Sequence, residues 1–280
     1  MPFTEFDIFL RKGESFAALE WSPPEEPKAI ILLIHGLSDH SARYHHVGSY
    51  FAAFGYVMIA VDLRGNGRSF GKRGHFPSYN RMMDDISLFM EEAGRRHPSL
   101  PFFLYGHSMG GNLVLNYLIR NRPRIAGAIV TSPWLRLTFK PSPYKVIMAK
   151  IMNKIFPSLI QHDGINPSHL SHDEEVARRY IADPLVHGRI SIRTFLEISL
   201  AGDYALKHAD KVECPLLLMH GTDDSLTSFS ASAEFSEKVI VKHTFRAWEG
   251  LFHELHNEFE KEAVLSFIKE WLDSVTITTR

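Results

Sequence analysis

A serine between two glycines is the residue of this sequence best placed to do chemistry. It lies in the run Gly106-His107-Ser108-Met109-Gly110, directly after an apolar segment and directly before a helical pattern. A sharp turn from strand to helix exposes such a serine and requires very small residues two positions away on either side. The N-terminus of the following helix directs backbone N–H groups toward negative charge that develops on a substrate oxygen. The spacing therefore predicts Ser108 as a nucleophile in acyl transfer.

A serine hydroxyl becomes a good nucleophile only beside a base, which in turn needs a carboxylate to orient it. Two loops further along the chain supply these groups. Asp223 and Asp224 follow the apolar run PLLLMHG, and His253 follows the next strand-like run, HTFRAWEG. We predict His253 as the general base. Spacing alone leaves the acid open between the neighbouring aspartates, one of which would be an ordinary turn residue.

The tetrahedral oxygen of an acyl-transfer intermediate is held by a pair of backbone N–H groups. One should come from Met109, directly after the nucleophile. The other should come from the loop after the apolar run AIILLIHG, where Leu37 follows Gly36. Leu37 and Met109 are therefore the predicted oxyanion donors.

Several histidines cluster in the sequence, but their spacing does not indicate a metal site. The cluster comprises His40, His45, His46, His253 and His256. It contains no H-E-x-x-H pattern, and the chain has no paired cysteines. The single cysteine, Cys214, precedes a proline at the start of a strand and is predicted to be a small core residue. We therefore predict neither a metal nor a cofactor.

The elements that position these residues are predicted to be strands alternating with helices. Runs typical of strands buried on both faces recur: AIILLIHG, GYVMIAVD, PFFLYGHS, AGAIVTS, PLLLMHG and HTFRAWEG. Helical patterns occur near Tyr44 to Phe54, in GNLVLNYLIRN and, last, over Glu258 to Asp273. The alternation predicts an α/β fold with a mostly parallel central sheet covered by helices. At the start, FDIFL and SFAALEW flank Lys12-Gly13 and predict an antiparallel hairpin at the sheet edge.

The alternating pattern stops over residues 135–209. A proline-bearing segment, KPSPYK, lies near the start of this stretch, which has no obvious central strand. We predict a helical cap here, inserted into a core domain formed by residues 1–134 and 210–280.

One segment of the predicted cap, residues 143–156, has the pattern of an amphipathic basic helix. Ile147, Ile151 and Ile155 form one line along it, and Lys150 and Lys154 are also four residues apart. The isoleucine line faces either a buried acyl tunnel or a lipid surface. We favour the buried interpretation.

The overall composition limits the partners. The 280 residues carry 31 Lys and Arg against 32 Asp and Glu, so no net field would attract nucleic acid. The N-terminal segment lacks the basic start and apolar stretch of a secretory signal, and a single cysteine cannot form an internal disulfide. We therefore expect a cytoplasmic protein. No apolar run is as long as a membrane-spanning helix, so membrane contact is expected to be peripheral at most, through the cap.

Several motifs together resemble one known group of enzymes. HGLSDHSARY is similar to its oxyanion loop, DLRGNGRS to its glycine-rich segment, GHSMGG to its serine turn, GTDDSL to its acid loop and EGLFHELHNE to its histidine loop. The motifs occur in the same order and span nearly the whole chain. On these grounds the chain resembles the monoacylglycerol lipase and lysophospholipase group of α/β-hydrolase serine hydrolases.

The resemblance implies an α/β-hydrolase fold with an inserted cap, and it selects between the two aspartates. The family's catalytic aspartate stands three residues after the loop glycine, which here is Asp224. The resemblance also implies a polar pocket for the alcohol end of the substrate, at Asp39, Arg43, Tyr180 and His256. The plainer alternative for Asp39 and Arg43 is an ion pair that stabilises their loop.

The implied activity is hydrolysis of carboxylic esters of single-chain lipids, above all monoacylglycerol, through an acyl-enzyme. The partner is then a small lipid ester. Lysophospholipase and broad carboxylesterase activities are the near alternatives. An acyltransferase, a peptidase and a non-catalytic binding protein are more distant ones, and the presence of Ser108, Asp224 and His253 counts against the last.

Overall fold

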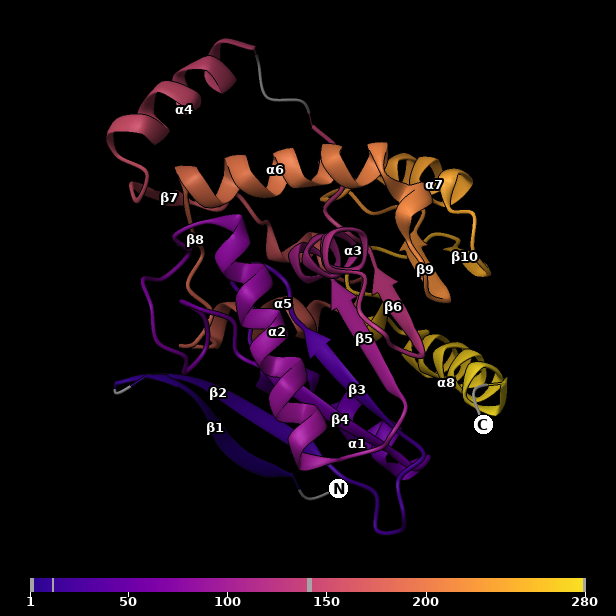
Figure 1. Ribbon diagram of the computed structural model, residues 1–280. Helices are drawn as coiled ribbons and strands as arrows, with labels where there is room; N and C mark the ends of the chain where they lie inside the picture. The colour runs from indigo at the N-terminus through magenta and orange to yellow at the C-terminus, as the bar shows by residue number, and fades with distance from the viewer. Residues whose placement is uncertain (1–2, 12, 140–142, 279–280) are drawn as a thin grey trace.

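An eight-stranded sheet forms the centre of the computed structural model, which describes residues 3–11, 13–139 and 143–278 (Figure 1). Its strands are Thr4–Arg11 (β1), Glu14–Trp21 (β2), Ala29–Ile34 (β3), Tyr56–Val61 (β4), Phe102–His107 (β5), Gly127–Thr131 (β6), Leu216–Gly221 (β9) and His243–Trp248 (β10). They lie in the order β1-β2-β4-β3-β5-β6-β9-β10. The pairs β1–β2 and β2–β4 are antiparallel, and the other neighbours are parallel. The predicted sheet with an edge hairpin is confirmed, although Lys12 of the predicted turn lies outside the described residues.

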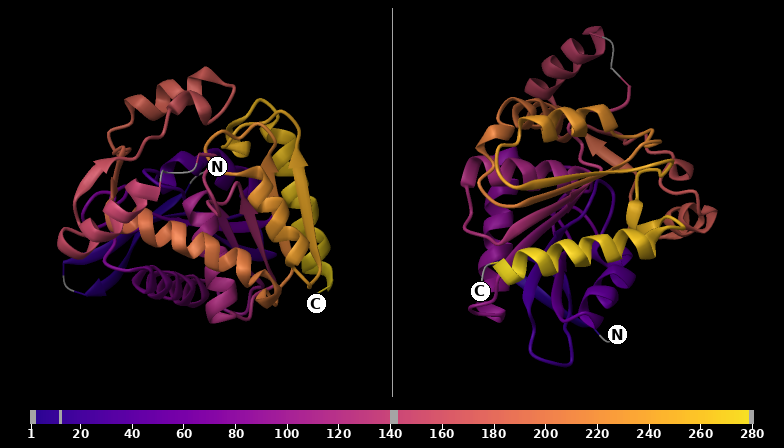
Figure 2. Two further views of the ribbon diagram at one scale, coloured as in Figure 1. Left: turned by 90° about the horizontal axis from the view of Figure 1, so that it is seen from above. Right: turned by 90° about the vertical axis from the view of Figure 1, so that its right-hand side faces the viewer.

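Helices cover both faces of this sheet (Figures 1 and 2). They are His45–Ala53 (α1), Tyr79–Arg96 (α2), Met109–Asn121 (α3), Ile192–Lys207 (α6), Phe229–Lys238 (α7) and Lys261–Thr278 (α8). The face that bears Ile30 and Leu32 of β3 packs against α2, α3, α6 and α7, and the face that bears Ile31 and Leu33 packs against α1 and α8. Because side chains alternate along a strand, a strand covered on both faces is a continuous apolar run.

Between β6 and β9 the chain forms elements outside the central sheet. They are Pro143–Ile155 (α4), Ile160–His162 (β7), Pro167–His169 (η2), Glu174–Ala182 (α5), Arg189–Ser191 (β8), α6 and Ala209–Lys211 (η3). β7 and β8 pair as a small antiparallel sheet. α6 packs on α3, and α4 lies on the outer side of α6 (Figure 1). The predicted cap boundaries stay a prediction, and residues 140–142 of the KPSPYK segment lie outside the described residues.

The last two elements differ from the sequence-based expectation. β10 is the edge strand opposite β1, and its side chains are mostly half-buried rather than buried on both faces. The final helix begins at Lys261, not at Glu258. Glu258 is fully buried in the preceding loop, where its carboxylate accepts hydrogen bonds from the backbone N–H groups of Phe252 and His172. Glu258 thus joins two loops and does not begin the helix.

The apolar line on α4 is exposed. The exposed fractions of Ile147, Ile151 and Ile155 are 57%, 48% and 59%, and Lys150 and Lys154 are exposed beside them. α4 lies at the periphery of the fold, so only its inner side meets another layer (Figure 1). The predicted helix is confirmed, but the buried interpretation of its isoleucine line is wrong.

The loops that carry the predicted site residues leave the carboxyl ends of parallel strands. Leu37 follows β3, Ser108 follows β5, Asp224 follows β9 and His253 follows β10. The carboxyl ends of parallel strands share one edge of a sheet, and ligands of such sheets bind there. The topology thereby brings together four loops that are far apart in the sequence.

Candidate active site

Ser108 occupies a tight turn between β5 and α3. Its backbone angles are φ 55° and ψ −117°, a conformation that a non-glycine residue adopts only when its surroundings impose it. A Cβ at Gly110 would collide with the carbonyl oxygen of Ile34, and one at Gly106 would collide with the carbonyl oxygen of Gly110. The glycines predicted from the motif therefore allow the turn to pack against the neighbouring strand.

A continuous chain of hydrogen bonds joins Ser108, His253 and Asp224. The Nε2 atom of His253 lies 2.9 Å from the hydroxyl oxygen of Ser108, and its Nδ1 atom lies 2.7 Å from Oδ2 of Asp224. A carboxylate only accepts hydrogen bonds, so Nδ1 carries the proton and Nε2 is left to accept one from the serine. The arrangement can remove a proton from the Ser108 hydroxyl.

The carboxylate of Asp224 is held on both oxygens. Oδ1 accepts hydrogen bonds from the backbone N–H groups of Leu226 (2.8 Å) and Thr227 (3.0 Å). Oδ2 accepts from His253, from the Thr227 hydroxyl at 2.8 Å and from Nε2 of His220 at 3.0 Å. Burial alone would raise the pKa of Asp224, but His253 and these hydrogen bonds lower it well below its usual range. The carboxylate stays ionised although it is buried.

Asp223, the other aspartate of this loop, is exposed. Its Oδ1 accepts a hydrogen bond from the neighbouring Thr222 hydroxyl at 3.2 Å. The structure thus brings Asp224, and not Asp223, to the imidazole of His253.

His253 is buried beside this carboxylate. Burial lowers the pKa of its imidazole, but the negative charge of Asp224 and the hydrogen bond to it raise the pKa more, so that it lies above the ordinary value of 6.5. The Ser132 hydroxyl donates a hydrogen bond of 2.8 Å to the backbone carbonyl of His253 and fixes the loop. His253 is therefore held by hydrogen bonds at both its ring and its backbone.

The loop after β3 lies against the nucleophile. Gly36 and Leu37 line the same cavity as Ser108, and a Cβ added at Gly36 would lie 3.3 Å from the Cβ of Ser108. Met109 is the first residue of α3, directly after the serine. Both predicted oxyanion donors thus belong to backbone segments that adjoin Ser108.

Polar residues form another wall of the Ser108 cavity. Asp39, Arg43 and Tyr180 line it. The Arg43 guanidinium donates to Asp39 at 2.9 Å, and lies 4.9 Å from the centre of the Tyr180 ring. Burial would raise the pKa of Asp39, but Arg43 lowers it far below its usual range. The Asp39–Arg43 ion pair exists, and it is part of the cavity wall.

Sequence reasoning missed Glu254, which completes this wall. Its carboxylate accepts two hydrogen bonds from Arg43, at 2.9 and 2.8 Å, in the forked geometry that suits a guanidinium. His256, the fourth predicted pocket residue, lies behind the wall. Its ring stacks on Tyr44 at 4.8 Å and meets His107 edge-on at 5.0 Å. The only sequence signal for Glu254 is its position next to His253.

Two further features bear on what can reach the serine. The cavity at Ser108 has a volume of about 20 Å³, room for about one water molecule. A mostly apolar cavity of about 310 Å³ lies between the loop after β6 and α6, lined by Trp134, Leu135, Phe195 and Leu196 among others. Trp134 also donates its backbone N–H to the Ser108 carbonyl at 3.0 Å. The Ser108 cavity therefore has room for little more than a water molecule, and an apolar cavity lies next to the serine turn.

The remaining predictions concern the single cysteine, a metal site and a membrane-spanning helix. Cys214 is buried, and burial raises the pKa of its thiol to about 12, as expected of a small core residue. Within the described ranges, no group of three or more His, Cys, Asp or Glu side chains is arranged to hold a metal ion. None of the described helices is long and apolar enough to cross a membrane.

The similarity to known proteins extends over the residues of this site. A sequence model described as "Serine aminopeptidase, S33" (Hydrolase_4) matches residues 25–260. The chain belongs to the Hydrolase_4 family. Residues 25–260 of this Hydrolase_4 chain contain Ser108, Asp224, His253 and the polar wall, so the match extends over the whole candidate site.

Individual relatives and one solved structure show which kinds of protein in this family the chain is similar to. This Hydrolase_4 chain is 32% identical to a monoacylglycerol lipase of Mycolicibacterium smegmatis over 91% of each protein. It is 38% identical, over 92% of its length, to an uncharacterized abhydrolase domain-containing protein of Dictyostelium discoideum, of which it spans 28%. The crystal structure of Paleococcus ferrophilus monoacylglycerol lipase matches with a TM-score of 0.85 and 33% identity, covering 93% of this chain and 99% of that one. The predicted α/β-hydrolase fold and the resemblance to this group are confirmed.

Proposed function

We propose that the chain is a serine hydrolase that cleaves the carboxylic ester of single-chain lipids, above all monoacylglycerol. The observation that carries the proposal is the hydrogen-bonded chain from Ser108 through His253 to Asp224. The likeness to monoacylglycerol lipases in sequence and in structure supports it.

The proposed mechanism has two steps. Ser108 attacks the ester carbonyl while Nε2 of His253 takes its proton, and the backbone N–H groups of Leu37 and Met109 hold the negative oxygen. The imidazolium then gives its proton to the leaving alcohol. Water, activated by the same imidazole, cleaves the acyl-enzyme. Asp224 stays ionised throughout and stabilises the imidazolium.

The choice of substrate rests on the two sides of the serine. We propose that the apolar cavity next to Trp134 accepts the acyl chain, where each buried methylene contributes about 0.8 kcal/mol. The wall of Asp39, Arg43 and Tyr180 would face the alcohol, and His256 would support it from behind. A neutral hydrogen bond adds only about 1 kcal/mol, so the wall chooses and orients the head group more than it binds it.

We further propose that residues 135–209 act as the cap of this site and that α4 contacts lipid surfaces. Its exposed Ile147, Ile151 and Ile155 are flanked by lysines that suit anionic head groups. Such contact would be peripheral.

A second candidate function is amide cleavage, because the family description names an aminopeptidase. The same serine and base serve both reactions, so the site geometry does not separate them. Turnover of an ester and an amide with the same acyl group and a matched leaving group separates them directly.

The test of the proposed function combines hydrolysis with active-site labelling. Ser108→Ala should lower monoacylglycerol turnover by roughly four to six orders of magnitude and abolish labelling by a fluorophosphonate, because the triad acts as one unit. Ser22→Ala, which changes an exposed serine, is the matched control and should alter neither. Substantial ester hydrolysis by folded Ser108→Ala would overturn the proposal.

A further inference from the structure

The loop that carries the proposed oxyanion donor Leu37 contains a buried serine in an unusual backbone conformation. We call this loop, residues 35–40, the oxyanion loop. Ser38 directly follows Leu37 and is fully buried. Its φ of 56° lies in the left-handed region, where a residue other than glycine is strained unless its surroundings hold it there. The position of the backbone next to Leu37 therefore depends on what holds Ser38.

The Ser38 hydroxyl is bound by a segment far along the chain, residues 163–187, which we call the cap segment. It donates a hydrogen bond of 2.5 Å to Oδ2 of Asp163. The Asp163 side chain is only 2% exposed, and its Oδ1 accepts the backbone N–H of Ile165 at 3.1 Å. Asp163 directly follows β7, and the pairing of β7 with β8 fixes the start of the segment. A carboxylate that is itself held thus accepts the one proton of the serine hydroxyl.

His187 lies against the same hydroxyl but does not compete for its proton. The Nδ1 atom of His187 is 3.3 Å from the Ser38 oxygen, and it already accepts the backbone N–H of Arg189 at 3.0 Å. Its Nε2 atom donates to the side-chain oxygen of Asn66 at 2.9 Å. Burial and nearby positive charges lower the pKa of this imidazole to about 4, so the ring is neutral. The three residue types of a triad meet here without forming one, because the aspartate contacts the serine directly.

Leu37 is held from two sides. Before it, the buried His35 donates from Nδ1 to the carbonyl of Gly36 at 2.8 Å, and its Nε2 accepts the backbone N–H of Leu63 at 2.9 Å. This side of the loop is therefore fixed by the segments that follow β3 and β4. After Leu37, the hydroxyl of Ser38 ties the loop to the cap segment.

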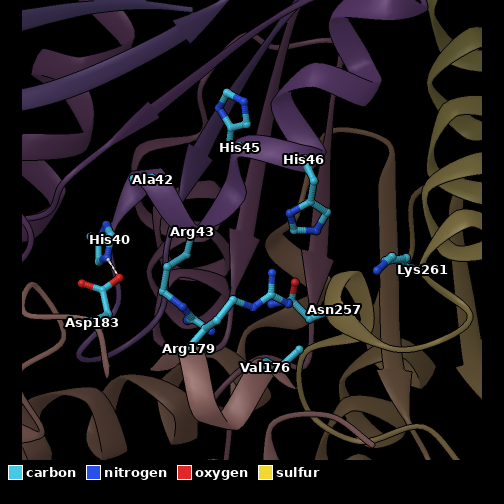
Figure 3. Close-up of a pocket in the computed structure, with 10 residues that line it drawn as sticks. All are labelled: His40, Ala42, Arg43, His45, His46, Val176, Arg179, Asp183, Asn257 and Lys261. Atoms are coloured by element: carbon cyan, nitrogen blue, oxygen red, sulfur yellow. Dashed lines mark hydrogen bonds and ion pairs between the residues drawn. The ribbon is translucent and has the colours of Figure 1, made fainter. Parts of the chain in front are cut away.

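A second contact joins the oxyanion loop to the cap segment. Nε2 of His40 donates to Oδ2 of Asp183 at 2.9 Å, the dashed line in Figure 3. Between the two aspartates that contact the loop, Ile165 and Leu170 line the cavity at the nucleophile. The cap segment is therefore part of the cavity wall, and it holds the oxyanion loop at two points.

We infer that Ser38 and Asp163 are positioning residues for the oxyanion hole, and that their hydrogen bond keeps the backbone N–H of Leu37 aimed at the developing negative oxygen. An oxyanion donor is effective only when it is already in place as the charge develops. Without the bond, the strained backbone at Ser38 can relax and shift Leu37 relative to Ser108. This inference rests on the proposed function and gives the proposed cap a part in the chemical step.

The test uses a short-chain monoacylglycerol and the matching thionoester, in which sulfur replaces the carbonyl oxygen. Ser38→Ala should lower kcat for the ester about tenfold and leave KM within about twofold, because the oxyanion hole acts mainly in the transition state. Sulfur is a weaker hydrogen-bond acceptor, so an aligned oxyanion hole favours oxygen. The ratio of the ester rate to the thionoester rate should therefore fall several-fold in Ser38→Ala.

Ser69→Ala is the matched control. It removes another buried serine hydroxyl, which accepts the backbone N–H of Ala17 at 2.9 Å. It should lower the melting temperature and change neither kcat nor the rate ratio. If Ser38→Ala behaved in the same way, its hydroxyl would be purely structural and the inference would be overturned.

Asp163 is tested through Ser38. Asp163→Ala should lower kcat by a factor similar to that of Ser38→Ala, and should cause no further loss when it is added to Ser38→Ala, because the two side chains act through one contact. Asp163→Asn keeps an oxygen that can accept the serine proton and should restore most of the rate. Additive losses, or a rate unaffected by Asp163→Ala, would contradict the inference and leave the proposed function standing.

Fluorophosphonate labelling separates the inference from the proposed function. The phosphonyl oxygen uses the same oxyanion hole, so Ser38→Ala should be labelled about tenfold more slowly than wild type. If wild type cleaved no ester but were labelled, the proposed function would fail. Slower labelling of Ser38→Ala would then still support the inference, and equal labelling rates would overturn it. A wild type that is neither active nor labelled would overturn both.

Discussion

His220 and His253 donate hydrogen bonds to the same oxygen, Oδ2 of Asp224, at 3.0 and 2.7 Å. His220 is fully buried, and its Nδ1 accepts a hydrogen bond from the Ser232 hydroxyl at 2.8 Å, which leaves Nε2 as the donor. The acid of the site is therefore held between two imidazoles, one that faces the nucleophile and one that does not.

This arrangement predicts that His220 positions Asp224. His220→Leu should lower kcat about tenfold with little change in KM, because the carboxylate loses one buried hydrogen bond and with it part of its fixed orientation. His220→Gln, which keeps a donor, should restore part of the rate. Steady-state kinetics with a thermal melt for each variant checks this. A purely structural His220 would lower stability in both variants and leave kcat of the folded enzyme unchanged.

The two aspartates of the acid loop should differ sharply. Asp224→Asn removes the charge that fixes the imidazole tautomer and stabilises the imidazolium, so turnover should fall by roughly four orders of magnitude. Asp223→Asn, on the surface, should stay within about twofold of wild type. The measurement is ester hydrolysis by the two purified variants. If Asp223→Asn were the more damaging change, Asp223 would be the acid that orients His253.

The pH dependence of the reaction should report His253. Its imidazole must be neutral to take a proton, and its pKa lies above 6.5 because of Asp224. The value of kcat/KM should therefore fall as the pH drops through a midpoint above 6.5, measured from about pH 5 to 9. By linkage, the raised pKa stabilises the fold fully below pH 6.5, and this contribution is lost as the pH rises through the folded-state value. A kinetic midpoint below 6.5 would contradict the assignment.

The exposed isoleucine line on α4 should affect the rate of hydrolysis only at lipid surfaces. Ile151→Glu should reduce hydrolysis of substrate in anionic vesicles several-fold and leave monomeric substrate within about twofold, because a charge replaces apolar area that would enter the bilayer. Phe9→Glu, at an even more exposed apolar side chain on β1, is the control and should change the rate in neither assay. A comparable loss on monomeric substrate would point to a role in the acyl path instead.

The sequence predicted those parts of the site that depend on local spacing and on strand ends. The glycines around Ser108 reveal the turn because a Cβ would collide with the carbonyl of Ile34 at Gly110 and with the carbonyl of Gly110 at Gly106. The order of the apolar runs places Asp224 and His253 at one edge of the sheet. Each inference needs only neighbouring residues and the geometry of a parallel sheet.

Contacts between distant loops were beyond such reasoning. Arg43 and Glu254 are 211 residues apart, and nothing in either segment indicates the pair. The exposure of Ile151 could not be predicted either, because the periodicity of an amphipathic helix shows that a face is apolar and not what covers it. β10 likewise has an apolar pattern, yet it lies at the sheet edge.

The bond between Arg43 and Glu254 has a mechanical consequence. Glu254 directly follows His253, so the partner of Arg43 and the proposed general base are neighbours in the chain. Under the proposed function, a head group that draws Arg43 toward itself would pull on the backbone that aligns the imidazole with Ser108. Selectivity among head groups would then act on the speed of the chemical step as well as on binding, and a poorly fitting alcohol would be bound yet turned over slowly.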